Sequence, residues 1–179
     1  AEIVHWGAPV DDLGGTDLAA AVARPLAHGS PDTVAPLTAV PEHGSGWPGR
    51  PGISGRRPGG AAWAPRFAPT GHTATATKLT LDLADATAEL AVRVTFELGE
   101  ALVVRARLTN SGTTKYALDA MSVTVPVADA AGELGTFGGR WAGEFQATRR
   151  AWASGAFTWE NRRGRTSQEH PPLLFAGVP

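Results

Sequence analysis

The acidic residues of this 179-residue chain are the first place to look for catalysis, but no pair of them stands out. Hydrolysis by a general acid and a partner carboxylate needs both groups to face one substrate. Asp82, Glu97 and Asp119 alternate out of apolar rows, so we expect them to face solvent. Glu144 and Glu160 lie among arginines and are expected to form ion pairs. The sequence also lacks a G-x-S-x-G motif, and we predict no catalytic residue within it.

Sites for metals, thiols and nucleotides lack support as well. The chain has no cysteine, which excludes thiol catalysis, disulfides and cysteine-based zinc sites. None of its histidines, at positions 5, 28, 43, 72 and 170, falls at a short metal-ligand spacing. Residues 44–49 match the letters G-x-G-x-x-G, but Pro48 and Pro51 are present and no helical pattern follows, as a dinucleotide site requires. We therefore predict no metal and no cofactor.

The Gly- and Pro-rich segment 41–71 holds the best candidates for ligand contact. Its length is typical of functional or disordered loops, but its aromatic residues favour an ordered excursion. Trp47 offers a face for stacking on a sugar ring, and the nearby His43 and Arg50 add polar groups. The alternative is that Trp47 anchors the loop by packing on the sandwich or at a subunit interface, a common role of tryptophan.

The charge and composition of the chain exclude several kinds of partner. Lys and Arg number 16 and Asp and Glu 17, which gives a formal net charge of -1. A nucleic-acid or anionic-membrane surface would need a clustered excess of basic residues. No apolar run is long enough for a transmembrane helix, and no signal-peptide pattern is visible. The lack of cysteine favours a cytoplasmic location, although the start at Ala1 rather than Met leaves open a segment removed earlier.

Period-two alternation predicts the fold. Apolar rows at Leu79–Leu83, Leu90–Leu98, Leu102–Leu108 and Met121–Val127 alternate with polar residues, as in half-buried strands. Turn residues at 99–100 and 110–113 connect them, so residues 72–127 are predicted to form an antiparallel meander. We predict an all-β antiparallel sandwich with long Gly/Pro loops and at most one or two short helices. One helix is expected over Asp17–Leu26, and a strand interrupted by Pro36 over Thr33–Val40.

Four blocks of sequence carry a family resemblance and together span almost the whole chain. In chain order they are His5-Trp6-Gly7; Val40-Pro41-Glu42-His43-Gly44 with Arg50-Pro51; Leu108-Thr109-Asn110-Ser111-Gly112 with Tyr116 and Leu118; and Gly139-Arg140-Trp141-Ala142 with Glu144, Arg149, Gly155, Glu160 and residues 163–167. The chain thereby resembles the N-terminal region of family-36 glycoside hydrolases, the bacterial alpha-galactosidases or melibiases. The fourth block is the most specific, because its order and composition are unusual.

The resemblance implies a β-supersandwich domain that precedes a catalytic (β/α)8 barrel. The catalytic aspartates of that family belong to the barrel, which the chain is too short to encode. We expect residues 1–179 to form a single domain, incomplete at its C-terminal end, that packs on the parent's barrel. The expected function is that of a non-catalytic domain of an alpha-galactosidase, with terminal alpha-galactosides as substrates of the parent. A free-standing carbohydrate-binding or adhesion sandwich without enzymatic activity is the alternative.

The family's N-terminal domain supports oligomers, and in some members the loop after the P-E-x-G segment touches sugar in a neighbouring subunit. That loop corresponds to Trp47–Arg50 here, so the resemblance implies a substrate-binding set of His43, Trp47 and Arg50 and a homo-oligomeric parent. Arginines of the fourth block are expected to tie loops together through carboxylates and backbone carbonyls. They are Arg140, Arg149, Arg163 and Arg165.

Overall fold

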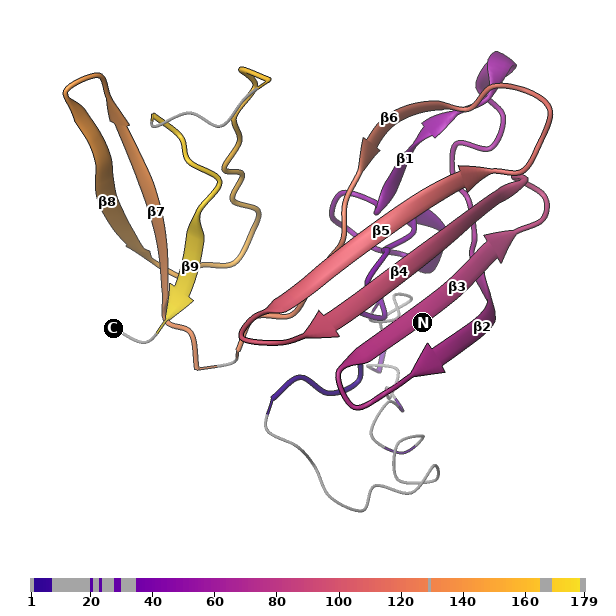
Figure 1. Cartoon of the computed structure of the whole chain (residues 1–179), viewed down its shortest axis with the longest axis horizontal. Coiled ribbons are helices and arrows are strands. Elements are labelled where there is room, and N and C mark those ends of the chain that lie inside the picture. The colour runs from indigo at the N-terminus through magenta and orange to yellow at the C-terminus, as the bar shows by residue number, and fades with distance from the viewer. Residues whose placement is uncertain are drawn as a thin grey trace. The chain divides into compact units, whose positions relative to one another are not determined.

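A computed structural model of the chain describes residues 2–7, 20, 23, 28–29, 35–128, 130–164 and 169–177. The chain divides into two compact units, Ala1–Val125 (unit one) and Pro126–Pro179 (unit two). Every strand in the described residues pairs antiparallel with its neighbours, and the helices named there are two three-residue 3-10 turns (Figure 1). The predicted all-β class is therefore confirmed. The predicted helix over Asp17–Leu26 lies almost wholly outside the described residues.

Unit one contains a four-stranded and a two-stranded sheet. The larger sheet is a meander in the order β2-β3-β4-β5, and the smaller one pairs β1 with β6. The strands are β1 (Ile53–Arg56), β2 (Ala68–Ala74), β3 (Lys78–Asp85), β4 (Leu90–Leu98), β5 (Leu102–Asn110) and β6 (Ala117–Met121), and the 3-10 turns are η1 (His43–Ser45) and η2 (Pro58–Gly60). The alternation predicted for 79–108 thus corresponds to three observed strands, in the predicted meander.

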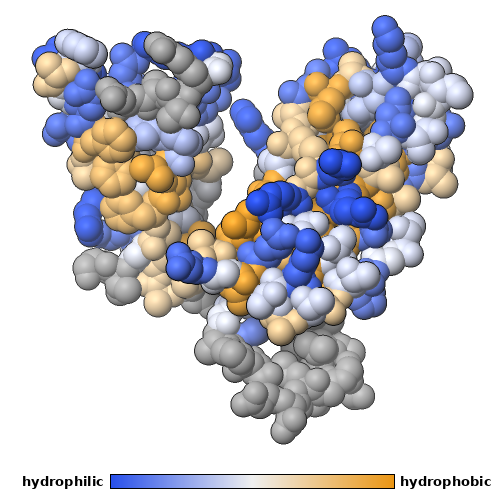
Figure 2. Space-filling view, in the orientation of Figure 1, coloured by the Kyte–Doolittle hydropathy of each residue, from blue (hydrophilic) through white to orange (hydrophobic). Residues whose placement is uncertain are grey.

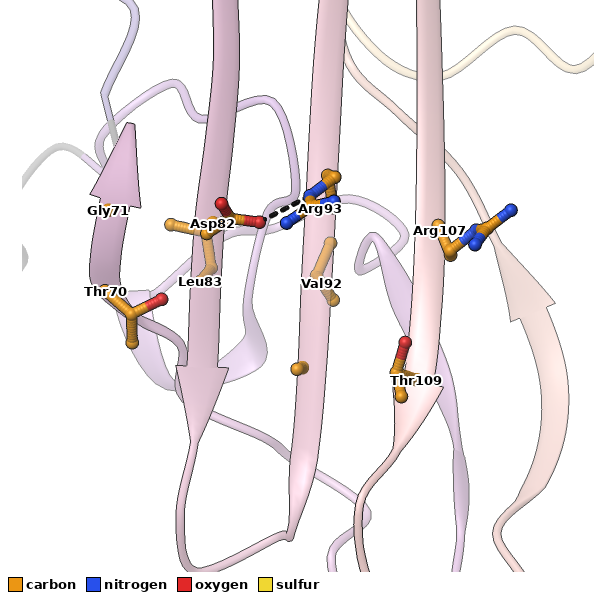
Figure 3. A pocket seen from close by; sticks show the side chains of 9 residues that line it. Thr70, Gly71, Asp82, Leu83, Val92, Arg93, Arg107 and Thr109 are labelled. Carbon is orange, nitrogen blue, oxygen red and sulfur yellow. Dashed lines mark hydrogen bonds and ion pairs between the residues drawn. The ribbon is translucent and has the colours of Figure 1, made fainter. Parts of the chain in front are cut away.

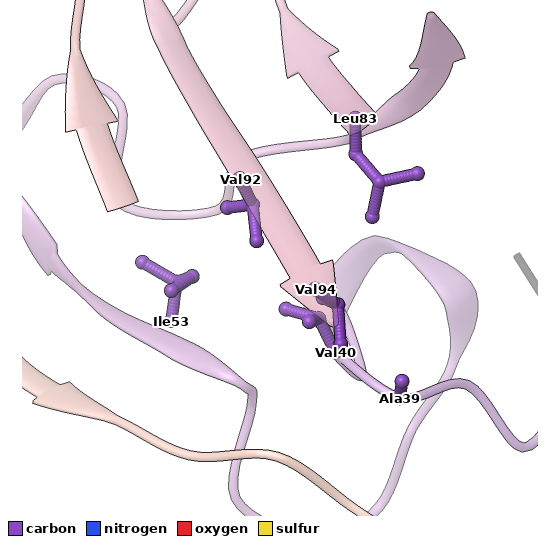
Figure 4. Close-up of a cluster of buried hydrophobic side chains, with 6 residues drawn as sticks. All are labelled: Ala39, Val40, Ile53, Leu83, Val92 and Val94. Atoms are coloured by element: carbon purple, nitrogen blue, oxygen red, sulfur yellow. The ribbon is translucent and has the colours of Figure 1, made fainter. Parts of the chain in front are cut away.

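The core of unit one lies on the inner face of the four-stranded sheet. Leu83, Val92 and Val94 point from β3 and β4 toward Val40 and Ile53 (Figure 4). These side chains are almost fully buried, because the apolar row of each strand faces one side of the pleat. Further apolar residues of β4, β5 and β6 pack around them, namely Phe96, Val104, Ala106, Leu108 and Met121. Two layers over a shared apolar interior make this a β-sandwich.

The strand predicted over Met121–Val127 is wrong in its limits and its partner. β6 begins at Ala117, ends at Met121 and pairs with β1 rather than with β5. The chain after β5 is held by hydrogen bonds to Arg57, next to β1, and so turns toward the second sheet. Beyond Met121 the backbone is bonded irregularly, with Ser122 N–H donating to the carbonyl of Gly52 and Thr124 N–H to that of Ala39.

The strand predicted over Thr33–Val40 is described only from residue 35 onward. In this part Thr38 forms a single antiparallel bridge with Glu2 rather than part of a longer strand. Ile3 N–H donates to the carbonyl of Leu37 at 2.7 Å, which adds a second link between the two segments. Pro36 has no N–H to donate, which is consistent with pairing this short.

Unit two is a three-stranded antiparallel sheet in the order β8-β7-β9. Its strands are β7 (Glu133–Arg140), β8 (Gly143–Ala151) and β9 (Leu174–Gly177). Three phenylalanines pack together in it, with Phe137 6.2 Å from Phe145 and 5.9 Å from Phe175 between ring centroids. Few described residues of this unit are buried, and Leu134 and Thr136 are among them.

Candidate functional site

The loop over residues 41–67 (the 41–67 loop) is fixed at both ends by hydrogen bonds. At its start, Gly52 N–H donates to the carbonyl of Pro41 at 2.7 Å. At its end, Phe67 N–H donates to the Glu42 carboxylate at 2.8 Å and Arg66 N–H to that of Asp85 at 2.7 Å. The excursion predicted over 41–71 is ordered, but it also contains β1 and both 3-10 turns, and its predicted end is wrong because residues 68–71 belong to β2.

Asp85, the last residue of β3, is the acid that joins this loop to the meander. Burial alone would raise the pKa of its carboxyl group, but hydrogen bonds from the backbone N–H groups of Ala88, Arg66 and Thr87 outweigh it and lower the pKa. The Ala88 and Thr87 bonds, at 2.9 and 2.8 Å, shape the turn from β3 to β4. One carboxylate therefore orders both a turn of the sheet and the end of the candidate loop.

Trp47 is half-buried and packs within the loop. Its indole N–H donates to the backbone carbonyl of Arg50 at 3.1 Å. Gly49 lies so close beneath the ring that a Cβ there would come within 2.8 Å of Trp47 Nε1. The polar edge of the indole is thus used inside the loop, which favours packing for this residue. The exposed guanidinium of Arg50 has no hydrogen bond or ion pair within the described part of the chain.

His43 lies in η1 and pairs with an aromatic residue that sequence reasoning did not select. The rings of His43 and Trp63 are 5.6 Å apart between centroids and tilted by 48°. Trp63 is 61% exposed, which leaves much of its ring open to solvent. The sequence offered a signal, a second tryptophan in the same Gly/Pro loop, but it did not show that this one would be the exposed one. The 41–67 loop therefore presents Trp63 beside His43, and Arg50 as a free cation.

The mid-loop residue Arg57 is a second feature that sequence reasoning missed. It is 8% exposed and its guanidinium donates to the carbonyls of Ala88 and Thr114 and to the side chain of Asn110, at 2.6–3.1 Å. The carboxylate of Glu89 lies 3.7 Å away and offsets the charge. Arg57 stabilises the loop rather than contacting a ligand, since its donors are used within the protein.

Ion pairs follow the sequence predictions in part. Asp82, Glu97 and Asp119 reach the surface, where each pairs with a basic side chain. Glu160 pairs with Arg162 at 2.9 Å, as expected, whereas Glu144 accepts from the backbone N–H of Ala142. Arg149 and Arg163 meet Glu133 and Glu169 at 3.0 and 2.7 Å. Arg165 lies outside the described residues, and no ion pair joins Arg140 to a described carboxylate.

Comparison with known proteins identifies the family. Residues 1–179, the whole chain, match the glycosyl hydrolase family 36 N-terminal domain. The chain belongs to this family. This family-36 domain is 37% identical over 181 residues to an alpha-galactosidase of Escherichia coli, and the match covers 100% of the chain but 25% of that relative.

The fold of the family-36 domain also matches a solved structure. It is that of the GH36 alpha-galactosidase AgaA from Geobacillus stearothermophilus, a doubly substituted form in complex with raffinose. The match has a TM-score of 0.80 and 22% sequence identity, and it covers 99% of the chain and 29% of that protein. The chain thus spans between a quarter and a third of the length of the relatives it matches. The resemblance to family 36 is confirmed.

The described residues contain no group of three or more His, Asp or Glu side chains arranged to hold a metal ion. The same residues form no helix that is long and apolar enough to cross a membrane.

Proposed function

We propose that this chain is the non-catalytic N-terminal part of an alpha-galactosidase that removes terminal alpha-galactosyl residues. The observation that carries the proposal is the match of all 179 residues to the family-36 N-terminal domain. The Escherichia coli relative bears the name alpha-galactosidase, and three quarters of its length lies outside the match. We assign the catalytic carboxylates to a (β/α)8 barrel in that remainder, because most of the carboxylates described in the chain pair with basic side chains or backbone N–H groups.

The test of this activity uses the longer polypeptide that contains the chain. Incubation with raffinose should release galactose, and proton NMR should show the alpha anomer first, as expected of hydrolysis with retention through two carboxylates. A polypeptide with no activity on raffinose, melibiose or aryl alpha-galactosides would contradict the proposal and favour a carbohydrate-binding module.

We further propose that the 41–67 loop contributes a sugar subsite in an oligomer of the parent enzyme. Trp63 supplies an exposed ring for stacking on the apolar face of a pyranose, and Arg50 supplies forked donors for hydroxyl groups. His43 holds the Trp63 ring from one side, and Trp47 fixes the backbone at Arg50. In this arrangement Arg50 keeps the substrate contact expected from the sequence, His43 and Trp47 hold the loop in place around it, and Trp63 adds the stacking ring.

Kinetics of the longer polypeptide test the subsite. Trp63→Ala and Arg50→Ala should each raise KM for raffinose, by about tenfold for a lost stacking or charged contact. Trp63→Phe should keep KM near that of the unsubstituted enzyme, because it retains a ring for stacking. Arg56→Ala is the control for Arg50→Ala on the same unit and should leave KM unchanged. Unchanged KM in Trp63→Ala and Arg50→Ala, with an altered sedimentation coefficient, would show that the loop packs against protein.

The rest of the parent polypeptide is the proposed partner of unit two. Its large apolar side chains include Trp141, which is 87% exposed, and five others at 41–52%, namely Phe145, Trp152, Phe157, Leu173 and Leu174. Figure 2 shows apolar residues gathered on the visible face of this unit. Such a surface is typical of a buried interface rather than of solvent. We therefore infer that residues 1–179 belong to a single domain that is completed by later residues of the parent polypeptide. We further infer that this domain supports the barrel. The cysteine-free composition supports a cytoplasmic location.

A further inference from the structure

The outer face of the four-stranded sheet, opposite the core, is a layer of charges matched across strands. Lys78 and Glu97 are directly opposite on β3 and β4 and pair at 2.7 Å. Glu97 also accepts a hydrogen bond from Arg105 of β5. Asp82 and Arg93 form the next pair, at 2.6 Å. Opposite charges at neighbouring positions stabilise a sheet, and the charged side chains of this face follow that rule with one exception.

The exception is Arg107. Register places it directly opposite Arg93, so the row across β3, β4 and β5 reads Asp82, Arg93, Arg107. The row thus holds one carboxylate and two guanidinium groups. The two like charges, Arg93 and Arg107, are directly opposite each other, which destabilises a sheet. Arg93 leans toward Asp82 while Arg107 extends the other way (Figure 3). Within the described residues Arg107 has no hydrogen bond or ion pair, so the row carries one unmatched positive charge.

A shallow depression of about 440 Å³ lies over this row. It is lined by the three charged side chains, by the hydroxyl-bearing Thr70 and Thr109, and by Gly71 (Figure 3). A Cβ at Gly71 would meet nothing within 4 Å, so the floor of the depression is open there. No aromatic side chain lines it, and stacking of a neutral sugar therefore has no support at this place.

We propose that Arg107 and Arg93, with the hydroxyl group of Thr109, form a binding site for an oxyanion, the phosphate or carboxylate group of a small molecule. Guanidinium groups bind such anions through paired N–H donors, and a threonine hydroxyl adds one further donor. The anion supplies the negative charge that the Asp82–Arg93–Arg107 row lacks: Arg107 turns toward it, while Arg93 stays paired with Asp82 through Nε and offers its remaining N–H groups. This site is separate from the 41–67 loop and does not depend on the proposed activity.

Titration calorimetry at low ionic strength tests the site, with inorganic phosphate and malonate as the two probes. Binding of phosphate but not of malonate would identify a phosphate site, and binding of malonate but not of phosphate would identify a carboxylate site. Arg107→Gln should weaken binding by about tenfold or more, because a charged hydrogen-bonding partner is lost. Arg105→Gln is the matched control on the same strand and face, since Arg105 is already paired with Glu97, and it should change affinity less than about twofold.

The urea midpoint of Arg107→Gln should equal or slightly exceed that of the unsubstituted chain, because Arg107 has no partner to lose and its removal relieves the repulsion from Arg93. No saturable heat with either probe would overturn the proposal. Equal weakening by Arg105→Gln and Arg107→Gln would also overturn it, since it would show diffuse attraction to a basic face rather than a site at Arg107.

Discussion

The guanidinium group of Arg57 connects parts of unit one that are far apart in the sequence. Its donors satisfy the carbonyl of Ala88 in the turn before β4 and the carbonyl of Thr114 after β5. Gly112 lies close enough that a Cβ there would come within 2.9 Å of the Arg57 side chain. A buried acceptor left without its donor costs free energy, so this residue should matter for stability beyond its charge.

Arg57→Ala is expected to lower the free energy of unfolding by about 3 kcal/mol, because the buried Ala88 carbonyl and several part-buried acceptors lose one shared donor. Arg56→Ala is the control one residue away. Arg56 pairs with Asp119 at 2.8 Å on the surface, and both side chains are more than half exposed. Its loss should cost less than about 1 kcal/mol. Urea denaturation followed by tryptophan fluorescence measures both, and equal losses would contradict the role given to Arg57.

The lowered pKa of Asp85 predicts a dependence of stability on pH. A carboxyl group whose pKa is lower in the folded state stabilises the fold above its unfolded pKa of about 3.9. That contribution disappears as pH falls through the lower folded value. The Asp85→Asn variant should therefore be less stable than the unsubstituted chain at pH 6. This difference in the free energy of unfolding should shrink below about pH 4. A gap that is unchanged between pH 6 and pH 3 would show that the charge of Asp85 does not contribute.

At the same scale, the sequence predicted an ordered loop but did not show which of its tryptophans is exposed. Trp47 and Trp63 both stand in a Gly/Pro loop, and only packing decides that Trp47 turns inward while Trp63 remains exposed. Arg57 and Arg56 are adjacent and chemically identical in the sequence. Their different burial follows from contacts with residues 88–114, which are distant in the chain and cannot be inferred from local pattern.

At the scale of elements, the strands with a clear alternation were predictable and the others were not. β3, β4 and β5 each bury one row of apolar residues, which produces the period of two. Every residue of β2 is exposed, and its sequence contains Pro69 and Gly71, so hydrogen bonding to β3 alone defines the strand. β6 is placed by long-range pairing with β1, which the alternation at Met121–Val127 did not reveal.

The β7–β9 pair depends on a glycine. Gly135 is directly opposite Phe175, whose ring occupies the space that a Cβ at position 135 would take. Gly135→Ala should therefore displace the ring and destabilise unit two by roughly 1–3 kcal/mol, as overpacking does. Hydrogen exchange of the β9 amides should become faster. Gly177→Ala, at the end of β9, is the control. The added Cβ would have no heavy atom within 4 Å, so exchange in the rest of that strand should stay unchanged.

At the level of the whole molecule, the described chain consists of two small units, each built on β-sheets. Unit one has a compact apolar interior, whereas unit two leaves Trp141 and several other large apolar residues exposed. The relatives are about three to four times longer than the chain. Both observations support a domain whose surface is completed by the rest of a parent protein. Composition and alternation predicted the sandwich, but the exposed face of unit two was not visible in them.

Under the function proposed above, these 179 residues form a scaffold without catalytic groups of their own. The most direct measurement is the rate of p-nitrophenol release from p-nitrophenyl alpha-galactoside, compared at equal molar concentration for this chain and for the longer polypeptide that contains it. We expect turnover by the longer polypeptide and none by the chain. Turnover by the purified chain, or none by the longer polypeptide, would contradict it.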